Sequence, residues 1–296
     1  MAITAQMVKD LREKTGAGMM DCKTALQETG GDIETAVDWL RTKGLAKAAK
    51  KSGRVAAEGL IAVAEAGDRA AMVELNSETD FVSRNEQFQA LVRSVAQAAL
   101  ATDGSLASVQ AAKLPDGRTV EGAITEAVAT IGENMTLRRA AVLTVKQGVV
   151  ASYVHAAIAP GLGKIGVIVG LESSADQAKL AALGKQVAMH VAAASPLAVD
   201  IDRLDPHTVE RERSVFAEQA REYGKPPAVI DKMGEGRLRK FYEESVLVKQ
   251  PFIMATDRTV ETVLNDATKD AGGTVKVTDF VAFRLGEGIQ REEEAA

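Results

Sequence analysis

Apolar side chains recur every three or four residues in three short runs between residues 3 and 44. This spacing puts each run on one face of a helix and predicts three short helices. Gly16 and Gly44 are the expected ends of the first and third helices, while Asp21 and Asp32 are the expected N-caps of the second and third. Such narrow apolar faces predict a compact three-helix bundle of the ubiquitin-associated type.

Basic side chains follow the predicted bundle in residues 45–54, which read LAKAAKKSGR. Lys43, Lys47, Lys50 and Arg54 recur at helical spacing and would form one positive stripe. A solvated face and a contact with a partner explain this stripe equally well. Residues 1–54 are therefore predicted to be a first domain, made of the bundle and a basic linker.

A different pattern, with strands as well as helices, begins after the linker. The predicted elements are strands over 59–64 and 70–76, a helix over about 85–101, a helix around 124–131 and a strand over 137–145. Gly67-Asp68 is the expected turn of the first hairpin, and Ser83 with Glu86 forms a capping-box pattern that would start the first helix. Residues 102–118 carry turn signals and are expected to be irregular.

The same order of elements recurs in the second half of the chain. The predicted elements are strands over 149–155 and 165–171, a helix over about 176–194, helical stretches over 206–223 and 227–246, and a strand over 275–285. The Gly-Lys-Pro-Pro segment at 224–227 is typical of the turn in an antiparallel helical hairpin.

These elements predict an α+β fold, in which a core of two similar halves follows the ubiquitin-associated-like bundle. The predicted domains are the bundle with its linker at 1–54, a core subdomain at 55–146, a second at 147–290 with a helical hairpin inserted at about 206–246, and a short acidic tail at 291–296.

Composition narrows the possible classes of function. The 296 residues carry a formal net charge of −5, whereas proteins that neutralise nucleic-acid phosphates usually have a basic excess. A single cysteine excludes an internal disulfide and suits a reducing compartment. Because the N-terminus lacks an apolar signal region and no apolar run approaches bilayer length, we expect a soluble cytoplasmic protein that binds neither nucleic acid nor membrane.

Signals for enzymatic chemistry are sparse. Residues 161–166 read GLGKIG and match the G-x-G-x-x-G pattern of dinucleotide-binding loops, but that site needs a helix after the last glycine. Here residues 165–169 continue as a strand, so a loop between strands is favoured. His155, His190 and His207 are far apart in sequence, and His190 suits a satisfied core position. We expect no cofactor, no metal, no direct nucleotide binding and no covalent catalysis.

The segment Thr79-Asp80-Phe81-Val82 lies at a predicted corner between a strand and a helix, where loops often carry function. On the residues alone, a Phe81 side chain folded onto the core is favoured over a projecting one, with Asp80 as a cap. The same tetrapeptide recurs at 278–281 inside the last predicted strand, where Phe280 would be a sheet residue. The four-residue motif alone therefore does not identify a functional site.

Longer segments resemble the elongation factor Ts family over nearly the whole chain. Residues 11–26 and 74–84 are similar to the two signatures of the family, and further matches are at 55–59, 131–134, 235–241, 250–252 and 286–289. The resemblance implies a guanine nucleotide exchange factor that binds elongation factor Tu in its GDP form and promotes GDP release. Some relatives carry a further C-terminal helical module, whose contacts are not expected of this chain.

The resemblance also implies roles for particular residues. Those expected to intrude near the Mg²⁺ and switch elements of the partner are Thr79, Asp80, Phe81 and Val82, with Phe81 as a wedge in an apolar pocket. The other implied partner-binding residues are Leu11, Met19, Met20, Ile131, Gly132 and His155. The helical hairpin at 206–246 resembles a projection that some relatives use to form a homodimer.

Two other functions stay open on the residues alone. A non-enzymatic adaptor or scaffold protein would bind a helix or a ubiquitin-like partner with its helical bundle. An enzyme would use residues 161–166 to bind a nucleotide.

Overall fold

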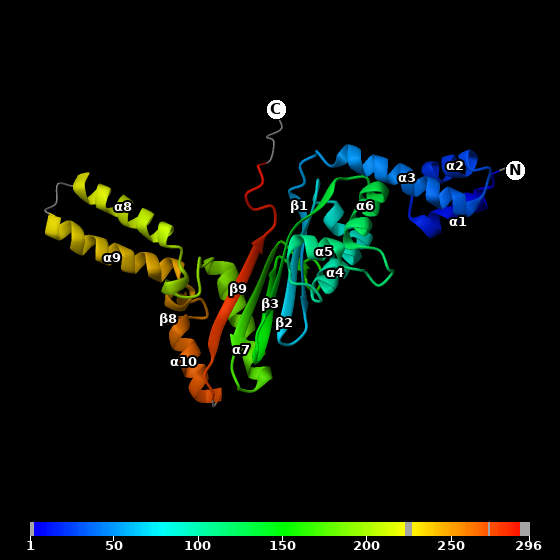
Figure 1. Cartoon of the computed structure of the whole chain (residues 1–296). Helices are drawn as coiled ribbons and strands as arrows, with labels where there is room; N and C mark the ends of the chain where they lie inside the picture. Colours follow the sequence, from blue (N-terminus) through cyan, green and yellow to red (C-terminus); the bar gives the residue numbers. More distant parts are fainter. Residues whose placement is uncertain (1–2, 223–226, 272, 291–296) are drawn as a thin grey trace.

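The computed structural model describes residues 3–222, 227–271 and 273–290 of the chain. Helices and antiparallel strands both contribute to the fold over these residues, which confirms the predicted α+β class. A helical region containing the N-terminal helices lies at one end of the molecule, the larger sheets lie in the middle, and a pair of long helices projects at the other end (Figure 1).

Three helices form the N-terminal region, as predicted. They are α1 (Ala5–Thr15), α2 (Met19–Glu28) and α3 (Ile33–Lys51). Leu11, Cys22 and Leu26 are fully buried in the apolar core that the three helices share. Asp32 caps α3 by accepting a hydrogen bond from the Thr35 amide, which confirms that cap. The likeness to a ubiquitin-associated domain stays a prediction.

Two predicted boundaries in this region are wrong. Helix α2 begins at Met19 with Gly18 as its N-cap, so Asp21 lies in the first turn, where it pairs with Lys47 at 2.9 Å. Helix α3 does not end at Gly44 but continues to Lys51. A Cβ atom at Gly44 would lie 2.9 Å from the Cβ of Ala129 in helix α6 (Val120–Ile131), so this glycine permits close helix packing. Most of the predicted linker is therefore helix.

The first of the larger sheets has the strand order β3-β2-β1-β5, and all neighbours are antiparallel. Its strands are β1 (Glu58–Glu65), β2 (Arg69–Ser77), β3 (Met135–Thr144) and β5 (Leu162–Gly163). Between β2 and β3 lie the 3-10 helix η1 (Val82–Arg84) and helices α4 (Glu86–Ala99), α5 (Leu106–Ala111) and α6. The predicted hairpin, helices and third strand are confirmed.

Residues 102–118 are less irregular than predicted, because they contain α5. Ser105 caps this short helix by accepting a hydrogen bond from the Ser108 amide, and Val109 is buried in the core beneath it. A cap and one apolar anchor are enough to order a single turn where the turn signals indicated a loop.

The second larger sheet has the strand order β4-β6-β9, again antiparallel. Its strands are β4 (Gly148–His155), β6 (Ile165–Glu172) and β9 (Lys276–Arg284). In the first sheet β2 lies between β1 and β3, and in the second sheet β6 lies between β4 and β9. The two halves share this three-strand order, to which the first sheet adds β5 from the second half of the chain.

The long connection between β6 and β9 is mostly helical. It contains α7 (Gln177–Ala194), η2 (Ile201–Arg203), α8 (Pro206–Glu222), α9 (Pro227–Ser245), η3 (Leu247–Lys249), the strands β7 (Pro251–Phe252) and β8 (Ala255–Thr259), and α10 (Val260–Ala271). Helices α8 and α9 lie side by side (Figure 1). The guanidinium of Arg237 lies 5.6 Å from the centre of the Phe216 ring. Most of the predicted turn at 224–227 falls outside the described residues.

The two larger sheets pack face to face, and β2 shows how. Ala71, Val73 and Leu75 belong to the apolar cluster under α4 and α6. Ala70 and Met72 belong to the cluster between the two sheets. This alternation follows from the two-residue period of a strand, so β2 is buried on both faces.

The GLGKIG segment serves this sheet packing. Residues 162–163 pair with β1, and a strand rather than a helix follows, as predicted. A Cβ atom at Gly166 would lie 2.6 Å from Ile61 Cγ2 and 2.7 Å from Met72 Sδ. The glycine is therefore explained by the close approach of the two sheets, and the segment lacks the helix N-terminus on which a pyrophosphate would rest.

A buried carboxylate follows Ala70 and Met72 in the row of β2 side chains that face the second sheet. The Glu74 side chain is fully buried and accepts hydrogen bonds from Arg138 Nη1 at 3.1 Å and Arg139 Nε at 2.5 Å. Asn76 Nδ2 and the amide of Gly286 donate to the same carboxylate at 3.1 and 2.9 Å. Four donors from three parts of the chain therefore compensate one buried negative charge.

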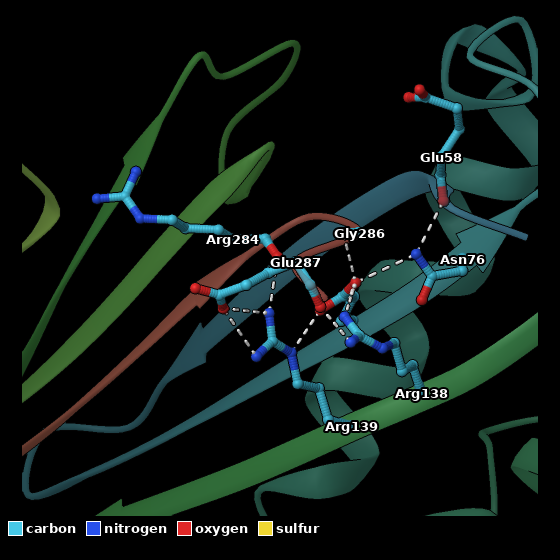
Figure 2. A network of polar contacts seen from close by, with 8 residues as sticks. Glu58, Asn76, Arg138, Arg139, Arg284, Gly286 and Glu287 are labelled. Atoms are coloured by element: carbon cyan, nitrogen blue, oxygen red, sulfur yellow. Dashed lines mark hydrogen bonds and ion pairs between the residues drawn. The ribbon is translucent and has the colours of Figure 1, made fainter. Parts of the chain in front are cut away.

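The two arginines extend this network to the end of the chain (Figure 2). Arg139 Nη2 donates to the carbonyl of Arg284 at 2.7 Å, and its guanidinium lies 4.3 Å from the centre of the Phe283 ring. Arg138 donates to the carbonyl of Glu287. The segment that follows β9 is thereby held against the first sheet.

His190 is a satisfied core histidine, as predicted. Its ring is fully buried, Nε2 lies 2.9 Å from Gln250 Oε1, and Nδ1 accepts a hydrogen bond from the Ile253 amide at 3.3 Å. Because an amide can only donate, the ring proton is on Nε2. Burial disfavours the charged ring and lowers the His190 pKa, although the hydrogen bond to Gln250 opposes that shift.

We expect Arg139→Met to lower the free energy of unfolding by about 3 kcal/mol, because Glu74 then loses a charged partner inside the protein. Urea denaturation followed by circular dichroism measures this loss. Glu287→Ala is the matched control: it removes the half-exposed carboxylate on the same arginine and should cost less than about 1 kcal/mol. Equal losses in the two variants would contradict the importance of the buried charge.

A second prediction concerns pH. The His190 pKa is lowered in the folded state from an unfolded value of about 6.5, so its contribution to stability is complete above that pH and is lost as the pH falls through the folded pKa. Below about pH 6.5, the unfolding free energy should fall more steeply for the natural chain than for His190→Gln, by at most about 1.4 kcal/mol per pH unit. Chemical denaturation across this range measures both slopes.

His207→Gln is the control for this comparison, because it changes an exposed histidine in α8. It makes the same change of residue outside the core. Identical slopes for the natural chain and His190→Gln would show that protonation of this ring is not linked to folding.

Candidate functional site

A tight turn connects β2 to α4, and we call residues 78–84 the tip. The hydroxyl and the amide of Ser83 both donate to the carbonyl of Asp80, at 2.5 and 3.1 Å. The Arg84 amide donates to the carbonyl of Phe81 at 3.1 Å. Helix α4 is capped instead by Asn85, whose side chain accepts from two amides, so the predicted capping box at Ser83 is wrong. The Ser83 hydroxyl closes the turn.

The tip presents an aromatic ring to solvent. The Phe81 side chain is 75% exposed, the most exposed of the large apolar side chains among the described residues. Asp80 beside it is exposed as well, whereas Val82 is buried in the core under α4. The interpretation that Phe81 folds back onto the core is therefore wrong.

The repeated tetrapeptide at 278–281 behaves as predicted. It lies within β9, where Phe280 pairs with Val169 of β6 and packs against the apolar cluster of the second half. The same four residues therefore place a phenylalanine within a sheet at 280 and an exposed phenylalanine at 81. Their positions in the fold account for this difference in environment.

Glu133 holds the first part of the tip. Its Oε2 accepts from the Thr79 amide at 2.9 Å, and its Oε1 accepts from the Thr79 hydroxyl at 2.6 Å. The Ser77 hydroxyl donates to the Thr79 carbonyl at 2.9 Å. Glu133 follows Gly132, which ends α6, so this clamp brings residues 131–133 next to the tip.

The neighbouring Asn134 connects the same place to α3. Its amide donates to Glu78 Oε1 at 2.6 Å, and its side chain donates to the Arg54 carbonyl at 2.7 Å. Lys51, the last residue of α3, donates to the carbonyl of Gly132. The tip, the end of α6 and the end of α3 therefore form one connected unit.

The basic stripe is explained largely by contacts within the chain. Lys43 lies over the Trp39 ring at 5.1 Å, Lys47 pairs with Asp21, and Arg54 lies 3.5 Å from Glu78. These contacts favour a structural role for the stripe over a partner surface.

The other residues implied to bind a partner lie in several places. Met19 and Met20 are 58% and 72% exposed on α2, in the helical region at the end of the molecule (Figure 1). Leu11 is fully buried in the core of that region, so it can act on a partner only by supporting the surface. His155 is exposed at the end of β4, where Tyr153 Oη lies 3.0 Å from its Nδ1.

The part of the chain that the structure describes contains no cluster of three or more His, Cys, Asp or Glu side chains suited to a metal ion. No helix within residues 3–222, 227–271 and 273–290 is both long and apolar enough to cross a bilayer. An open groove of about 550 Å³ lies between β1 and β4, with Glu65 and Lys185 as its charged lining groups.

Glu133, Asn134 and Lys51 hold the tip in place, although the sequence indicates no role for them. The available signals are that Glu133 and Asn134 directly follow the glycine that ends a helix and lie in the family match at 131–134. Their partners are far away along the chain, so only the folded structure connects them.

Comparison with known proteins identifies the relatives of this chain. A family model described as elongation factor TS matches residues 78–287. Proteins named elongation factor Ts from Sinorhizobium medicae and Brucella anthropi are each 59% identical, over 294 and 293 residues, covering 99% of this chain and 96% of each relative. One from Agrobacterium fabrum is 58% identical over 292 residues, covering 98% of this chain and 95% of its own length.

The tip itself generates a prediction about stability. Phe81→Ala should change the free energy of unfolding by less than about 0.5 kcal/mol, because the ring is already in water. The adjacent Val82→Ala should cost about 2 kcal/mol, since it removes two buried carbon atoms. Urea denaturation of both variants measures the difference. A larger loss for Phe81→Ala than for Val82→Ala would mean that the ring is packed in solution.

Proposed function

This chain belongs to the elongation factor Ts family, and from that premise we propose that it binds elongation factor Tu in its GDP form and accelerates the release of GDP. Family membership establishes a role in the elongation stage of protein biosynthesis. The observation that carries the finer proposal is the exposed Phe81 ring on a tip whose two ends are anchored.

The proposed action of the tip is an intrusion into the GTPase domain of the partner. Thr79 and Val82 are the anchored positions, and Asp80 and Phe81 are the ones that project. Phe81 acts as a wedge in an apolar pocket near the Mg²⁺ ion and the switch elements, and this displaces the ion that bridges the phosphates. No covalent bond is made or broken.

The energetics of such a wedge are reasonable. A factor that binds the empty GTPase better than the GDP form must weaken GDP binding by the same factor, because the two equilibria are linked. A thousandfold loss of GDP affinity requires about 4 kcal/mol of differential binding. A buried aromatic anchor can contribute about 2 kcal/mol or more, and lost metal contacts add to it. By the same linkage, GTP binding releases the factor.

Other surfaces complete the proposed complex. Ile131, Gly132 and His155 would lie against the same GTPase domain, and the exposed Met19 and Met20 would contact one of its helices. Support for Ile131 and Gly132 comes from Glu133, which brings the end of α6 next to the tip. A homodimer through residues 206–246 is a further proposal, supported by the long pair α8 and α9 that projects from the core (Figure 1).

We expect Phe81→Ala to slow GDP release from elongation factor Tu by on the order of tenfold or more, since the lost anchor corresponds to at least ~2 kcal/mol. Release of a fluorescent GDP analogue, followed by stopped flow, measures the rate. Phe280→Ala is the matched control, because it changes the equivalent phenylalanine in the second copy of the tetrapeptide, inside β9. Release at the natural rate with Phe81→Ala would exclude this residue as the wedge.

A further inference from the structure

We propose that Glu133 is the positioning residue of the tip, which fixes the loop so that Asp80 and Phe81 are presented to the GTPase in one geometry. This inference rests on the proposed exchange function and extends it to a residue on another element. Glu133 acts through Thr79 rather than at the nucleotide.

The contact between Glu133 and Thr79 restrains backbone and side chain together. One carboxylate oxygen holds the Thr79 amide and the other holds its hydroxyl, at 2.9 and 2.6 Å. Hydrogen bonds to an ionised acceptor are stronger than neutral ones, and a two-point contact also fixes orientation. Because Thr79 directly precedes Asp80, its position sets where the projecting residues begin.

Glu133 is itself held from both sides. Lys51 donates to the carbonyl of Gly132, and the Asn134 side chain donates to the carbonyl of Arg54. Lys51 is the last residue of α3, and Arg54 lies three residues beyond it. The backbone that carries Glu133 is therefore held at the end of α3, and the tip is tied to it through Thr79.

The other contacts of the tip hold different residues. Glu78 Oε1 accepts from the Asn134 amide at 2.6 Å, and the Ser83 carbonyl accepts from Gln89 Nε2 at 3.0 Å. The bonds from Ser83 to Asp80 lie within the turn, and Val82 is anchored by apolar burial. At Thr79, directly before the projecting residues, Glu133 restrains the amide and the hydroxyl, while Ser77 donates to the carbonyl.

The test separates docking from the exchange step. GDP release is measured against increasing concentrations of each variant, which gives a saturating rate and a half-saturating concentration. We expect Glu133→Ala to lower the saturating rate by about tenfold, the size expected for losing the charged hydrogen bonds that hold the tip in its working geometry. The half-saturating concentration should change by less than about threefold, because other surfaces supply docking.

A variant that conserves the shape of Glu133 and a control in the preceding helix make this test specific. Glu133→Gln keeps one acceptor oxygen and should give an intermediate saturating rate. Glu126→Ala is the matched control, because it removes a carboxylate from α6 that pairs with Arg118. It should behave like the natural chain. A natural saturating rate for both Glu133 variants would overturn the proposal.

A double variant distinguishes positioning from general damage. If Glu133 acts only through the tip, adding Glu133→Ala to Phe81→Ala should slow release little further than Phe81→Ala alone. Independent, multiplying losses would overturn the proposed route, because they would mean that Glu133 acts elsewhere.

A measurement without the partner decides the inference even if the exchange function fails. Amide hydrogen exchange of residues 78–85, read by mass spectrometry, should speed up by about tenfold in Glu133→Gln and stay unchanged in Glu126→Ala. If the natural chain does not accelerate GDP release, the proposed function is refuted, but the positioning role of Glu133 is not. Unchanged amide exchange in Glu133→Gln would refute the positioning role.

Discussion

The buried carboxylate of Glu74 joins parts of the chain that are far apart in sequence. An unpaired charge in this place would be strongly destabilising, so the fold depends on Arg138 and Arg139 from β3 and on the amide of Gly286 after β9. The same contacts fix the end of β9, in the second sheet, to β2, an inner strand of the first. The face-to-face packing of the two sheets and the closure of the chain on itself are therefore linked to one charge.

Strand β2 connects the buried Glu74 network to the tip. Glu74 lies three residues before the end of that strand, and the tip begins directly after Ser77. Burying β2 on both faces leaves little freedom to the residues that follow it. An aromatic ring held in water contributes little to the stability of the free chain, and the proposed exchange function gives this exposed ring a role.

The order of the elements could be predicted from the sequence, because apolar spacing distinguishes strands from helices in both halves. Some local signals were overridden by tertiary contacts. Gly44 predicts a helix end, yet it lies inside α3, where the helix packs closely on Ala129. Ser83 predicts a helix cap, yet its hydroxyl closes the turn of the tip. Phe81 is predicted to be a core residue, since aromatic side chains are often buried, yet it is exposed.

Long-range polar contacts could not be predicted, because nothing local encodes them. Thr79 and Glu133 are separated by 54 positions, and Glu74 and Gly286 by 212. Their pairing depends on strand order and register, which follow only from the assembled sheets. The family resemblance located the tip and its proposed target, whereas the structure explains how the tip is held.

Hydroxyl-radical footprinting of the complex with nucleotide-free elongation factor Tu tests the central claim most directly. Oxidation of Phe81 is compared between the free and the bound chain, with Phe280 in β9 as an internal reference. Insertion of the tip into an apolar pocket predicts strong protection of Phe81 and unchanged reactivity of Phe280. Equal oxidation of Phe81 in the free and bound chain would contradict the account.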